Sequence, residues 1–404
     1  MSRHAVLCRF GEIFLKKGNR PAFIKRLADN MQRAVAPFGA RVERGHGRIL
    51  VWLPAPSGPG SEGGGNDPEP ALTALSRVFG LTSLSPVLVV ERDLGAITQA
   101  AIAETQAAIA AWPAKSPPSF KVEARRADKR FLPASPELAR QVGGAVFQAT
   151  GLRVDVHQPD LLIGIEIGYE HAFVYARVIP APGGLPVGAT GKADLLLSGG
   201  IDSPVAGWMS MKRGCHLAAT YFHSFPYTGD RTKEKVKGLA SLLARWQGDL
   251  ELRVVPFTAA QKALRDAGEP RLAVVLYRRM MMRVATHLAR ERGALALVTG
   301  EALAQVASQT LENLTAIEAA AGLLVLRPLI AHDKVETVAL ARRIGTYDRS
   351  IEPYEDSCSM FVPEHPEIRA RLADVEAVEQ RVDIAQLVED CVRGTERIRC
   401  KPGE

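Results

Sequence analysis

Residues 198–203, with the sequence SGGIDS, combine the residue types that bind a phosphate group. They follow an apolar run at 193–197 that predicts a buried parallel strand, and Pro204 begins a run that predicts a helix. A loop between a strand's carboxyl end and a helix's amino end presents unpaired backbone N–H groups and the positive end of the helix dipole. The two glycines allow the backbone to approach an anion closely, and the two serines add hydroxyl donors. The segment therefore predicts a phosphate site, in which Asp202 holds Mg²⁺ or orders the loop.

A second candidate phosphate loop, at 186–193, does not have the required residues. Pro186 stands where a Walker A loop needs its first glycine, and Ala193 stands where it needs serine or threonine. Residues 198–203 instead resemble the PP-loop of the ATP pyrophosphatases. That resemblance implies cleavage of ATP between its α- and β-phosphates and adenylylation of a substrate oxygen.

The segment 181–404 alternates strand and helix patterns, which is typical of a doubly wound parallel sheet. The expected strands are 193–198, 217–222, 250–256, 295–300 and 323–329. Long helices are expected at 231–247 and 271–293, and the tail from His365 to about Cys400 is expected to be helical. In such sheets ligands bind at the carboxyl ends of the strands, so polar residues at those ends become candidates for a site.

Several residues meet that condition. Tyr221 and Phe222 end the second strand, where they either frame an adenine base or belong to the ordinary core. Arg278 lies in a largely apolar helix and either extends to solvent or binds an anion. Hydrogen-bonding residues surround and follow the end of the fourth strand, namely Gly300, Glu301, Gln305, Ser308 and Gln309.

Lys334 stands at the expected amino end of a helix, where its charge opposes the helix dipole. Asp333 and Glu336 have the spacing of a capping box, which predicts that the helix begins here. A nearby phosphate would remove the electrostatic conflict and let the lysine stabilise departing pyrophosphate. The alternative is a solvated lysine at a cost of a few tenths of a kcal/mol.

Cys358 lies in a polar stretch at 354–361, whereas structural cysteines usually lie in apolar runs, as Cys8 does. An exposed thiol is a candidate nucleophile or sulfur carrier. Glu355 and Asp356 disfavour a thiolate there, so the structural alternative stays open. The sequence contains no Cys-x-x-Cys pair and its histidines are isolated, so we expect no structural zinc or iron–sulfur site.

The composition indicates a globular protein of two or three domains. Of its 404 residues 47% are hydrophobic and 24% charged, with a formal net charge of +7, which permits an anionic partner such as RNA. No apolar run approaches the roughly 18 residues of a membrane span, and the first residues lack a signal-peptide pattern. The five scattered cysteines form no disulfide framework, so we expect a reducing, cytoplasmic location.

The first 180 residues predict two α+β units, 1–70 and 71–180. Strands are expected at 5–10, 47–53, 120–126, 161–168 and 171–178, and helices at 21–38, 72–79, 97–111 and 136–150. A flexible linker is expected at 54–70. The densest basic patch consists of Arg125, Arg126, Lys129 and Arg130 beside an aromatic residue, which suits an RNA backbone. A solvated face is the alternative.

With these features in place, the whole chain resembles the tRNA 4-thiouridine synthases, also called tRNA sulfurtransferases. The resemblance is carried by residues 11–20, 77–81, 120–129, 182–203 and 327–334, and by Cys358. It implies a ferredoxin-like domain at 1–70, a THUMP RNA-binding domain at 71–180, and a PP-loop ATP pyrophosphatase domain at 181–404. Members of this family adenylylate O4 of uridine 8 in tRNA and replace that oxygen with sulfur.

The resemblance also implies roles for individual residues. Asp202, Lys334 and Cys358 are the expected catalytic residues, and the four residues of the basic patch are expected to bind tRNA. ATP, with Mg²⁺, is expected at Leu196, Leu197, Ser198, Gly199, Gly200, Asp202, Ser203, Tyr221, Phe222, Arg278, Gly300 and Gln309. The implied partners are a cysteine desulfurase as persulfide donor, a sulfur-carrier protein of thiamine thiazole synthesis, and a second copy of the chain.

The expected sulfur route differs from that of relatives with a carboxy-terminal rhodanese domain, for which 404 residues leave no room. We expect the persulfide to reach Cys358 directly, with Cys215, Cys391, Cys400 or an external reductant completing the cycle. Two alternatives stay open, another PP-loop tRNA thiolase and a non-catalytic RNA-binding protein. The paired cysteines of a 2-thiolase are absent, and the presence of Asp202 and Lys334 argues against a non-catalytic protein.

Overall fold

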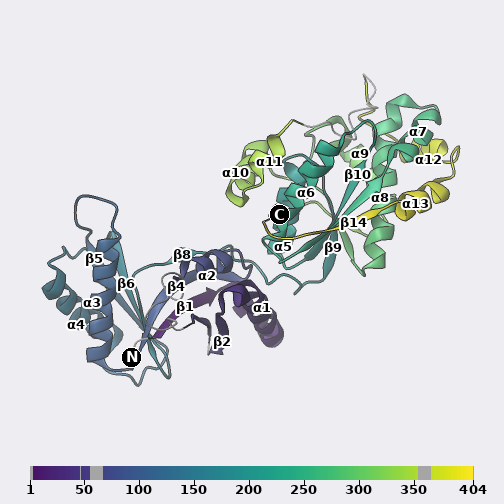
Figure 1. Cartoon of the computed structure of the whole chain (residues 1–404). Helices are drawn as coiled ribbons and strands as arrows, with labels where there is room; N and C mark the ends of the chain where they lie inside the picture. The colour runs from purple at the N-terminus through teal and green to yellow at the C-terminus, as the bar shows by residue number, and fades with distance from the viewer. Residues whose placement is uncertain (1–2, 46, 55–66, 354–364, 404) are drawn as a thin grey trace. The chain divides into compact units, whose positions relative to one another are not determined.

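The computed structural model describes residues 3–45, 47–54, 67–353 and 365–403. Cys358 and most of the predicted linker lie outside these ranges. The chain divides into two compact units, Met1–Gly184 and Leu185–Glu404, which are considered separately below (Figure 1).

Unit 1 is built on one sheet of eight strands in the order β2-β3-β1-β4-β7-β6-β5, with β8 beside β4. Its strands are β1 (Arg3–Phe10), β2 (Arg41–Gly45), β3 (Arg48–Trp52), β4 (Leu81–Val90), β5 (Phe120–Arg126), β6 (Leu161–Ile167), β7 (Ala172–Tyr175) and β8 (Ile179–Pro180). All the pairs are antiparallel except β5 with β6. Because β4 pairs with both β1 and β7, the sheet runs without a break through both predicted amino-terminal domains. The limits of those domains at residues 70 and 180 stay predictions.

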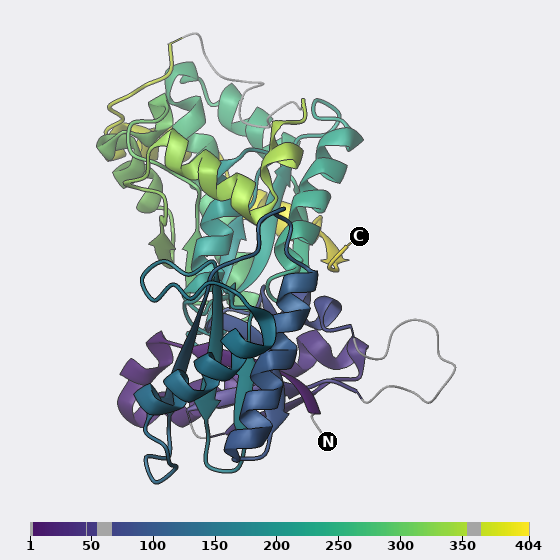
Figure 2. The same cartoon turned by 90° about the vertical axis from the view of Figure 1, so that its left-hand side faces the viewer.

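Helices cover unit 1 in two groups. They are the 3₁₀ segments η1 (Glu12–Asn19) and η2 (Ala36–Phe38) and the helices α1 (Arg20–Val35), α2 (Glu69–Leu75), α3 (Leu94–Ala110) and α4 (Ser135–Thr150). The first group packs on β1, β3 and β4 around a core that includes Val6, Leu27 and Met31. Figure 2 shows α3 (blue) and α4 (teal) side by side along the sheet, where they bury Ile97 and Val142.

Three strands of unit 1 are absent from the sequence-based prediction, namely β2, β4 and the two-residue β8. The central strand β4 was missed because Pro86 interrupts its pattern, yet Pro86 lies in the ladder opposite Val6. The edge strand β2 is mostly exposed and charged, so it lacks apolar alternation. The predicted helix at 72–79 instead ends at Leu75, and the end of the predicted linker already belongs to that helix, which begins at Glu69.

Unit 2 contains a six-stranded sheet in the order β13-β12-β9-β10-β11-β14. Its strands are β9 (Lys192–Leu196), β10 (His216–His223), β11 (Leu250–Pro256), β12 (Ala296–Val298), β13 (Leu324–Leu326) and β14 (Glu396–Cys400). The five predicted strands exist and pair in parallel. The wholly helical tail was a wrong prediction, because β14 pairs antiparallel with β11 and closes one edge of the sheet.

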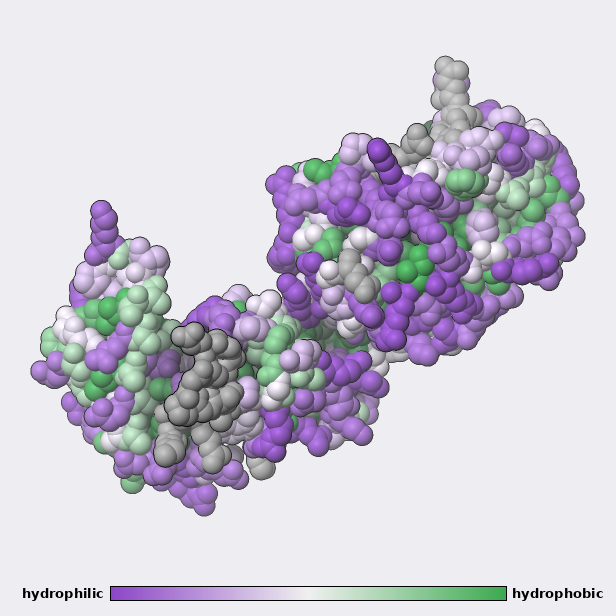
Figure 3. Space-filling model, viewed as in Figure 1, coloured by the Kyte–Doolittle hydropathy of each residue, from purple (hydrophilic) through white to green (hydrophobic). Residues whose placement is uncertain are grey.

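Helices lie on both faces of this sheet, as a doubly wound fold requires (Figure 1). One face carries α5 (Asp202–Lys212), α6 (Asp230–Ala244), α10 (Lys334–Ile344) and α11 (Tyr347–Ile351). The other carries α7 (Thr258–Asp266), α8 (Ala273–Glu291), α9 (Leu311–Glu318), α12 (Leu372–Glu379) and α13 (Ile384–Arg393), with the short segments η3 (Pro270–Leu272) and η4 (Ala307–Gln309). Hydrophilic residues cover most of unit 2 in the view of Figure 3. Among the described residues, no helix has the length and hydrophobicity that crossing a membrane needs.

The chain order of the sheet identifies where a ligand would bind. From β9 the chain adds β10 and β11 on one side, and then returns to place β12 and β13 on the other. Such a reversal leaves a crevice at the carboxyl ends of the strands beside the reversal. The loop 197–201 leaves β9 at that point, so the fold presents the predicted phosphate loop to the crevice.

A buried ion cluster holds α12 against α8. Glu379 is 7% exposed and accepts hydrogen bonds from Arg279 at 2.8 Å and from Arg283 at 2.6 and 2.7 Å. Burial alone would raise the pKa of Glu379, but the hydrogen bonds from the two arginines outweigh it and lower the pKa to about 2.

We therefore expect Glu379 to make stability depend on pH. A carboxyl group with a lowered folded-state pKa stabilises the fold above its unfolded pKa, and this contribution is lost as the pH falls toward the folded value. The difference corresponds to roughly 3 kcal/mol at neutral pH. In urea denaturation, Glu379→Gln should cost most at pH 7 and progressively less between pH 5 and pH 2. An equal cost at every pH would contradict this account.

Candidate active site

The predicted phosphate loop is closed onto the first turn of α5 by its two serines. The Ser198 amide donates to the Ser203 hydroxyl at 2.9 Å, and the two hydroxyls lie 3.1 Å apart. The Gly200 amide donates to the Ser198 hydroxyl at 3.3 Å. Pro204 is the third residue of α5, which confirms the predicted strand, loop and helix. The backbone therefore surrounds the amino end of α5, where an anion is favoured.

The strand that carries this loop is held by a charged group in the sheet core. Asp194 of β9 is fully buried, 2.8 Å from an Arg253 guanidinium nitrogen and 2.9 Å from the Thr220 hydroxyl. Burial raises the pKa of Asp194 to about 6, against the effect of Arg253. Asp194, Thr220 and Arg253 belong to β9, β10 and β11, so their contacts join the three strands below the loop. Removing Asp194 or Arg253 would leave the other buried charge unpaired.

A cavity of about 280 Å³ opens beside the loop. It is lined by Leu196, Leu197, Ser198, Gly199, Gly200, Asp202, Ser203, Thr220, Tyr221, Phe222, Thr232, Arg278, Met281, Met282, Thr299, Gly300, Glu301, Gln305, Val306 and Gln309. These include every residue that the sequence resemblance assigned to ATP. The cavity therefore brings together residues from β9, α5, β10, α8 and the segment after β12, which the sequence separates widely.

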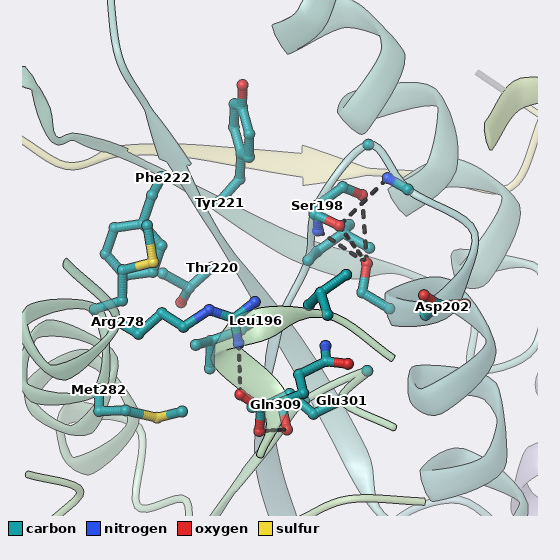
Figure 4. A pocket seen from close by; sticks show the side chains of 18 of the residues that line it. Leu196, Ser198, Asp202, Thr220, Tyr221, Phe222, Arg278, Met282, Glu301 and Gln309 are labelled. Atoms are coloured by element: carbon teal, nitrogen blue, oxygen red, sulfur yellow. Dashed lines mark hydrogen bonds and ion pairs between the residues drawn. The ribbon is translucent and has the colours of Figure 1, made fainter. Parts of the chain in front are cut away.

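One wall of the cavity is apolar and the opposite side is polar. Leu196, Phe222 and Met282 form the apolar side, as Figure 4 shows. Tyr221 points away from Phe222, because adjacent residues of a strand face opposite sides. The Tyr221 hydroxyl lies 3.4 Å from His223 Nδ1. Gln309 is 6% exposed, and its Oε1 atom has no hydrogen-bond partner among the described residues. Such a wall suits a flat apolar ring that also donates a hydrogen bond.

Gly300 allows the end of β12 to lie directly against the start of α5. A Cβ atom built at Gly300 would lie 2.6 Å from the Ser203 nitrogen and 2.8 Å from the Asp202 carbonyl carbon. Both contacts are to backbone atoms, which cannot move without displacing the loop. Glycine is therefore required here by the close approach of two backbones.

Asp202 connects the loop to α10. Lys334 Nζ lies 2.7 Å from Asp202 Oδ1, and Gln305 Nε2 donates to Oδ2 at 2.9 Å. Lys334 is the first residue of α10, which begins with the predicted capping box of Asp333 and Glu336. The two polar residues predicted to act together thus meet beside the phosphate loop, although 132 residues separate them.

Arg278 extends from α8 into the cavity and meets the carboxylate of Glu301, which sequence reasoning named as a polar candidate at the end of the fourth strand but did not assign to ATP. Its NH1 atom lies 2.6 Å from Glu301 Oε1, and Arg327 Nε lies 2.8 Å from Glu301 Oε2. Sequence reasoning gave Glu301 no defined role, and it included Arg327 only in the segment that carries the family resemblance. Their positions in the sequence could have indicated a role, because Glu301 and Arg327 each follow the end of a parallel strand within three residues.

The four residues of the predicted basic patch in unit 1 fall into two kinds. Arg126 donates to the backbone carbonyls of Lys129, Phe131 and Pro133, and Arg130 pairs with Asp128, so both have structural partners. Arg125 and Lys129 expose their side chains to solvent. The patch exists on the surface, and only part of its charge is used inside the unit.

The thiols considered as partners of Cys358 differ in access. Cys391 and Cys400 are buried, and burial raises the pKa of the Cys391 thiol to about 11. Cys215 is partly exposed and lies 3.6 Å from the Thr190 hydroxyl. Cys358 itself lies outside the described residues, so its position relative to the cavity stays a prediction.

Comparison with known families and structures agrees with this geometry. Residues 188–384 match the family model "Thiamine biosynthesis protein (ThiI)", residues 5–85 the "ThiI ferredoxin-like domain", and residues 100–177 the "THUMP domain". A probable tRNA sulfurtransferase of Moorella thermoacetica is 47% identical over 98% of both chains. One from Caldanaerobacter subterraneus is 42% identical over 96% of this chain and 98% of its own. A crystal structure of a 4-thiouridine synthetase with RNA and ATP covers 99% of this chain and 100% of its own, at a TM-score of 0.88 and 34% identity.

The fold and the loop define the class: a PP-loop domain of the ATP pyrophosphatase type, preceded by ferredoxin-like and THUMP domains. The curated relatives match over nearly their whole length. The chain belongs to the tRNA sulfurtransferase (ThiI) family, whose members are enzymes that transfer sulfur to tRNA.

Proposed function

We propose that this protein uses ATP to convert uridine 8 of tRNA into 4-thiouridine. The observation that carries the proposal is the meeting of the phosphate loop, the Asp202–Lys334 ion pair and the half-apolar cavity at one edge of the sheet. An anion site, a cation beside it and a wall for a flat base are the features that ATP requires. The structural relative with bound RNA and ATP supports the same ligands.

The first chemical step is adenylylation. Uridine O4 attacks the α-phosphorus of ATP, the bond from that phosphorus to the bridging oxygen breaks, pyrophosphate leaves, and the uracil ring loses its N3 proton to solvent. The backbone around residues 198–203 holds the phosphates, and Lys334 stabilises the negative charge that develops on the departing group. A carbonyl oxygen is a poor leaving group, whereas AMP is a good one. Adenylylation therefore makes the oxygen on C4 replaceable by sulfur.

The Asp202 carboxylate lines the cavity and would hold Mg²⁺, because carboxylate oxygens are ligands that this cation prefers. When bound, Mg²⁺ would neutralise phosphate charge. Asp202 accepts from Lys334 and Gln305 in this structure, so the carboxylate would also orient both side chains toward the phosphates.

The second step is sulfur transfer. A cysteine desulfurase supplies a persulfide to Cys358, its terminal sulfur attacks C4, the C4–O bond breaks, and AMP leaves. A second thiolate then attacks the Cys358 sulfur, which releases the thiocarbonyl and leaves a disulfide for a reductant to reset. The burial of Cys391 and Cys400 favours an external thiol, or the partly exposed Cys215, over these two.

Unit 1 would hold the tRNA. Arg125 and Lys129 leave their charges available for phosphates, whereas Arg126 and Arg130 shape the surface through internal partners.

A supply of sulfur to the thiamine thiazole through a carrier protein is a second proposed role, favoured by the description of the matching family model.

The test compares two sulfur donors. Purified protein, unmodified tRNA and Mg-ATP are incubated with sulfide, or with a cysteine desulfurase and cysteine, and 4-thiouridine is quantified. We expect product from both donors with the wild type, and from sulfide alone with Cys358→Ala. Full activity of Cys358→Ala with the desulfurase would reject the persulfide route, and tRNA binding without any product would favour the non-catalytic alternative.

A further inference from the structure

The cavity contains a carboxylate whose position gives it a role beyond charge balance. Glu301 follows Gly300, and its side chain is 4% exposed. Oε1 accepts from Arg278 NH1 at 2.6 Å. Oε2 accepts from Arg327 Nε at 2.8 Å and from the Thr299 hydroxyl at 2.9 Å. Both oxygens are therefore engaged, by side chains from α8, from the residue after β12 and from the residue after β13.

The charges in this cluster balance. Arg327 pairs with Glu318 as well as Glu301, so two carboxylates face the guanidinium groups of Arg278 and Arg327. A buried carboxylate between two arginines is favourable only where both of its oxygens accept hydrogen bonds, as those of Glu301 do. The cluster is thus a built feature beside the cavity, which Arg278, Thr299 and Glu301 line, and Figure 4 shows the Arg278 side chain extending from α8 into it.

Arg278 lines the cavity with a side chain that is 23% exposed, and its hydrogen bond to Glu301 uses NH1. Its Nε–H is buried and has no partner among the described residues, so contact with a ligand in the cavity would come from the exposed part of the guanidinium. An arginine side chain has several rotatable bonds, and holding it in one conformation before a ligand binds reduces the entropy cost of binding. Glu301 supplies that restraint through a charge-assisted hydrogen bond, which is stronger than a neutral one.

We propose that Glu301 is a positioning residue for nucleotide binding, which holds Arg278 in the orientation that contacts ATP. The proposal rests on the proposed function only in taking ATP as the ligand. Arg327 and Thr299 hold Glu301 in turn, so the ends of β12 and β13 determine where the α8 arginine points. Glu301 does not touch the reacting atoms and acts through Arg278.

The first test is the dissociation constant for ATP, measured by equilibrium dialysis on the full-length protein. We expect Glu301→Gln to weaken ATP binding about tenfold, because a neutral amide holds the guanidinium less firmly. In steady state the KM for ATP should rise by the same factor, while kcat changes less than twofold. An ATP affinity equal to that of the wild type would overturn the proposal.

Glu379→Gln is the matched control. Glu379 is likewise buried and bound by two α8 arginines, of which Arg279 is the neighbour of Arg278, but it does not line the cavity. We expect the control to lower Tm and leave ATP affinity unchanged. If both variants weakened ATP binding equally, loss of stability would explain the result and the proposal would be wrong.

A double-variant cycle tests whether Glu301 acts through Arg278. Arg278→Ala should weaken ATP binding, and adding Glu301→Gln should weaken it no further. Additive losses would contradict a positioning role. Should Glu301→Gln fail to fold, Arg327→Lys loosens the same carboxylate and should show a smaller loss in the same direction, whereas no loss would count against the proposal. If the wild type bound ATP but formed no 4-thiouridine, the proposed function would be rejected. The comparison of ATP affinities would still decide whether Glu301 positions Arg278.

Discussion

Replacing Lys334 with methionine should lower the rate of AMP formation by roughly 10²- to 10³-fold, the usual effect of removing one group that stabilises transition-state charge. Lys334 Nζ lies 2.7 Å from Asp202 at the mouth of the phosphate loop. Methionine keeps much of the side-chain length but removes the charge that would offset the departing pyrophosphate. The KM for ATP should change far less than kcat, because the loss concerns charge that develops during the reaction. Single-turnover release of AMP in the presence of unmodified tRNA measures the effect.

Lys237→Met is a suitable control for that experiment. Lys237 is also a lysine of unit 2 paired with a carboxylate, Glu234 at 3.7 Å, but Glu234, unlike Asp202, does not line the cavity. We expect wild-type rates from this variant. Equal rates for Lys334→Met and the wild type would show that Lys334 is the solvated residue that its position at a helix end also permits.

Replacing Gly300 with alanine should weaken ATP binding by roughly 10- to 100-fold, because overpacking of this kind costs about 1–3 kcal/mol. The new Cβ would lie 2.6 Å from the Ser203 nitrogen, and a backbone atom can give way only if the start of α5 moves. That movement would displace Asp202 and open the loop. Titration of ATP into the full-length variant gives the affinity directly.

Gly229→Ala is its control, since a Cβ built at Gly229 meets nothing within 4 Å and the residue has an ordinary φ of −79°. We expect Gly229→Ala to bind ATP as the wild type does. Undiminished affinity in Gly300→Ala would mean that the close packing of β12 on α5 does not determine the shape of the phosphate loop.

The local parts of the site could be predicted from the sequence. Strand, loop and helix at 193–212 are contiguous, so their residue types alone indicate a phosphate site. The capping box at Asp333 placed Lys334 at a helix start for the same reason. That Lys334 meets Asp202 could be expected only from the parallel order of the strands, which brings their carboxyl ends to one edge.

Contacts that depend on packing could not be predicted. Arg278 and Glu301 lie 23 residues apart, and Arg327 lies 26 residues beyond Glu301, so no local pattern joins them. The strand β14 has charged residues on both sides of Ile398, so its sequence is typical of an exposed segment. It is a strand because it pairs with the edge of β11. Proline is disfavoured inside a central strand, so Pro86 breaks the strand pattern of β4. Pairing of β4 with β1 nevertheless holds this segment in the sheet.

The most direct test of the central claim is the stoichiometry of the reaction on defined tRNAs. The wild-type protein is given Mg-ATP, sulfide and either unmodified tRNA or the same tRNA with cytidine in place of uridine 8. AMP, pyrophosphate and 4-thiouridine are then counted. We predict one AMP and one pyrophosphate for each 4-thiouridine with the uridine-8 tRNA, and none of the three above background with the substituted tRNA. Release of ADP and phosphate, or equal 4-thiouridine formation in both tRNAs, would contradict the assignment of this site to adenylylation of uridine 8.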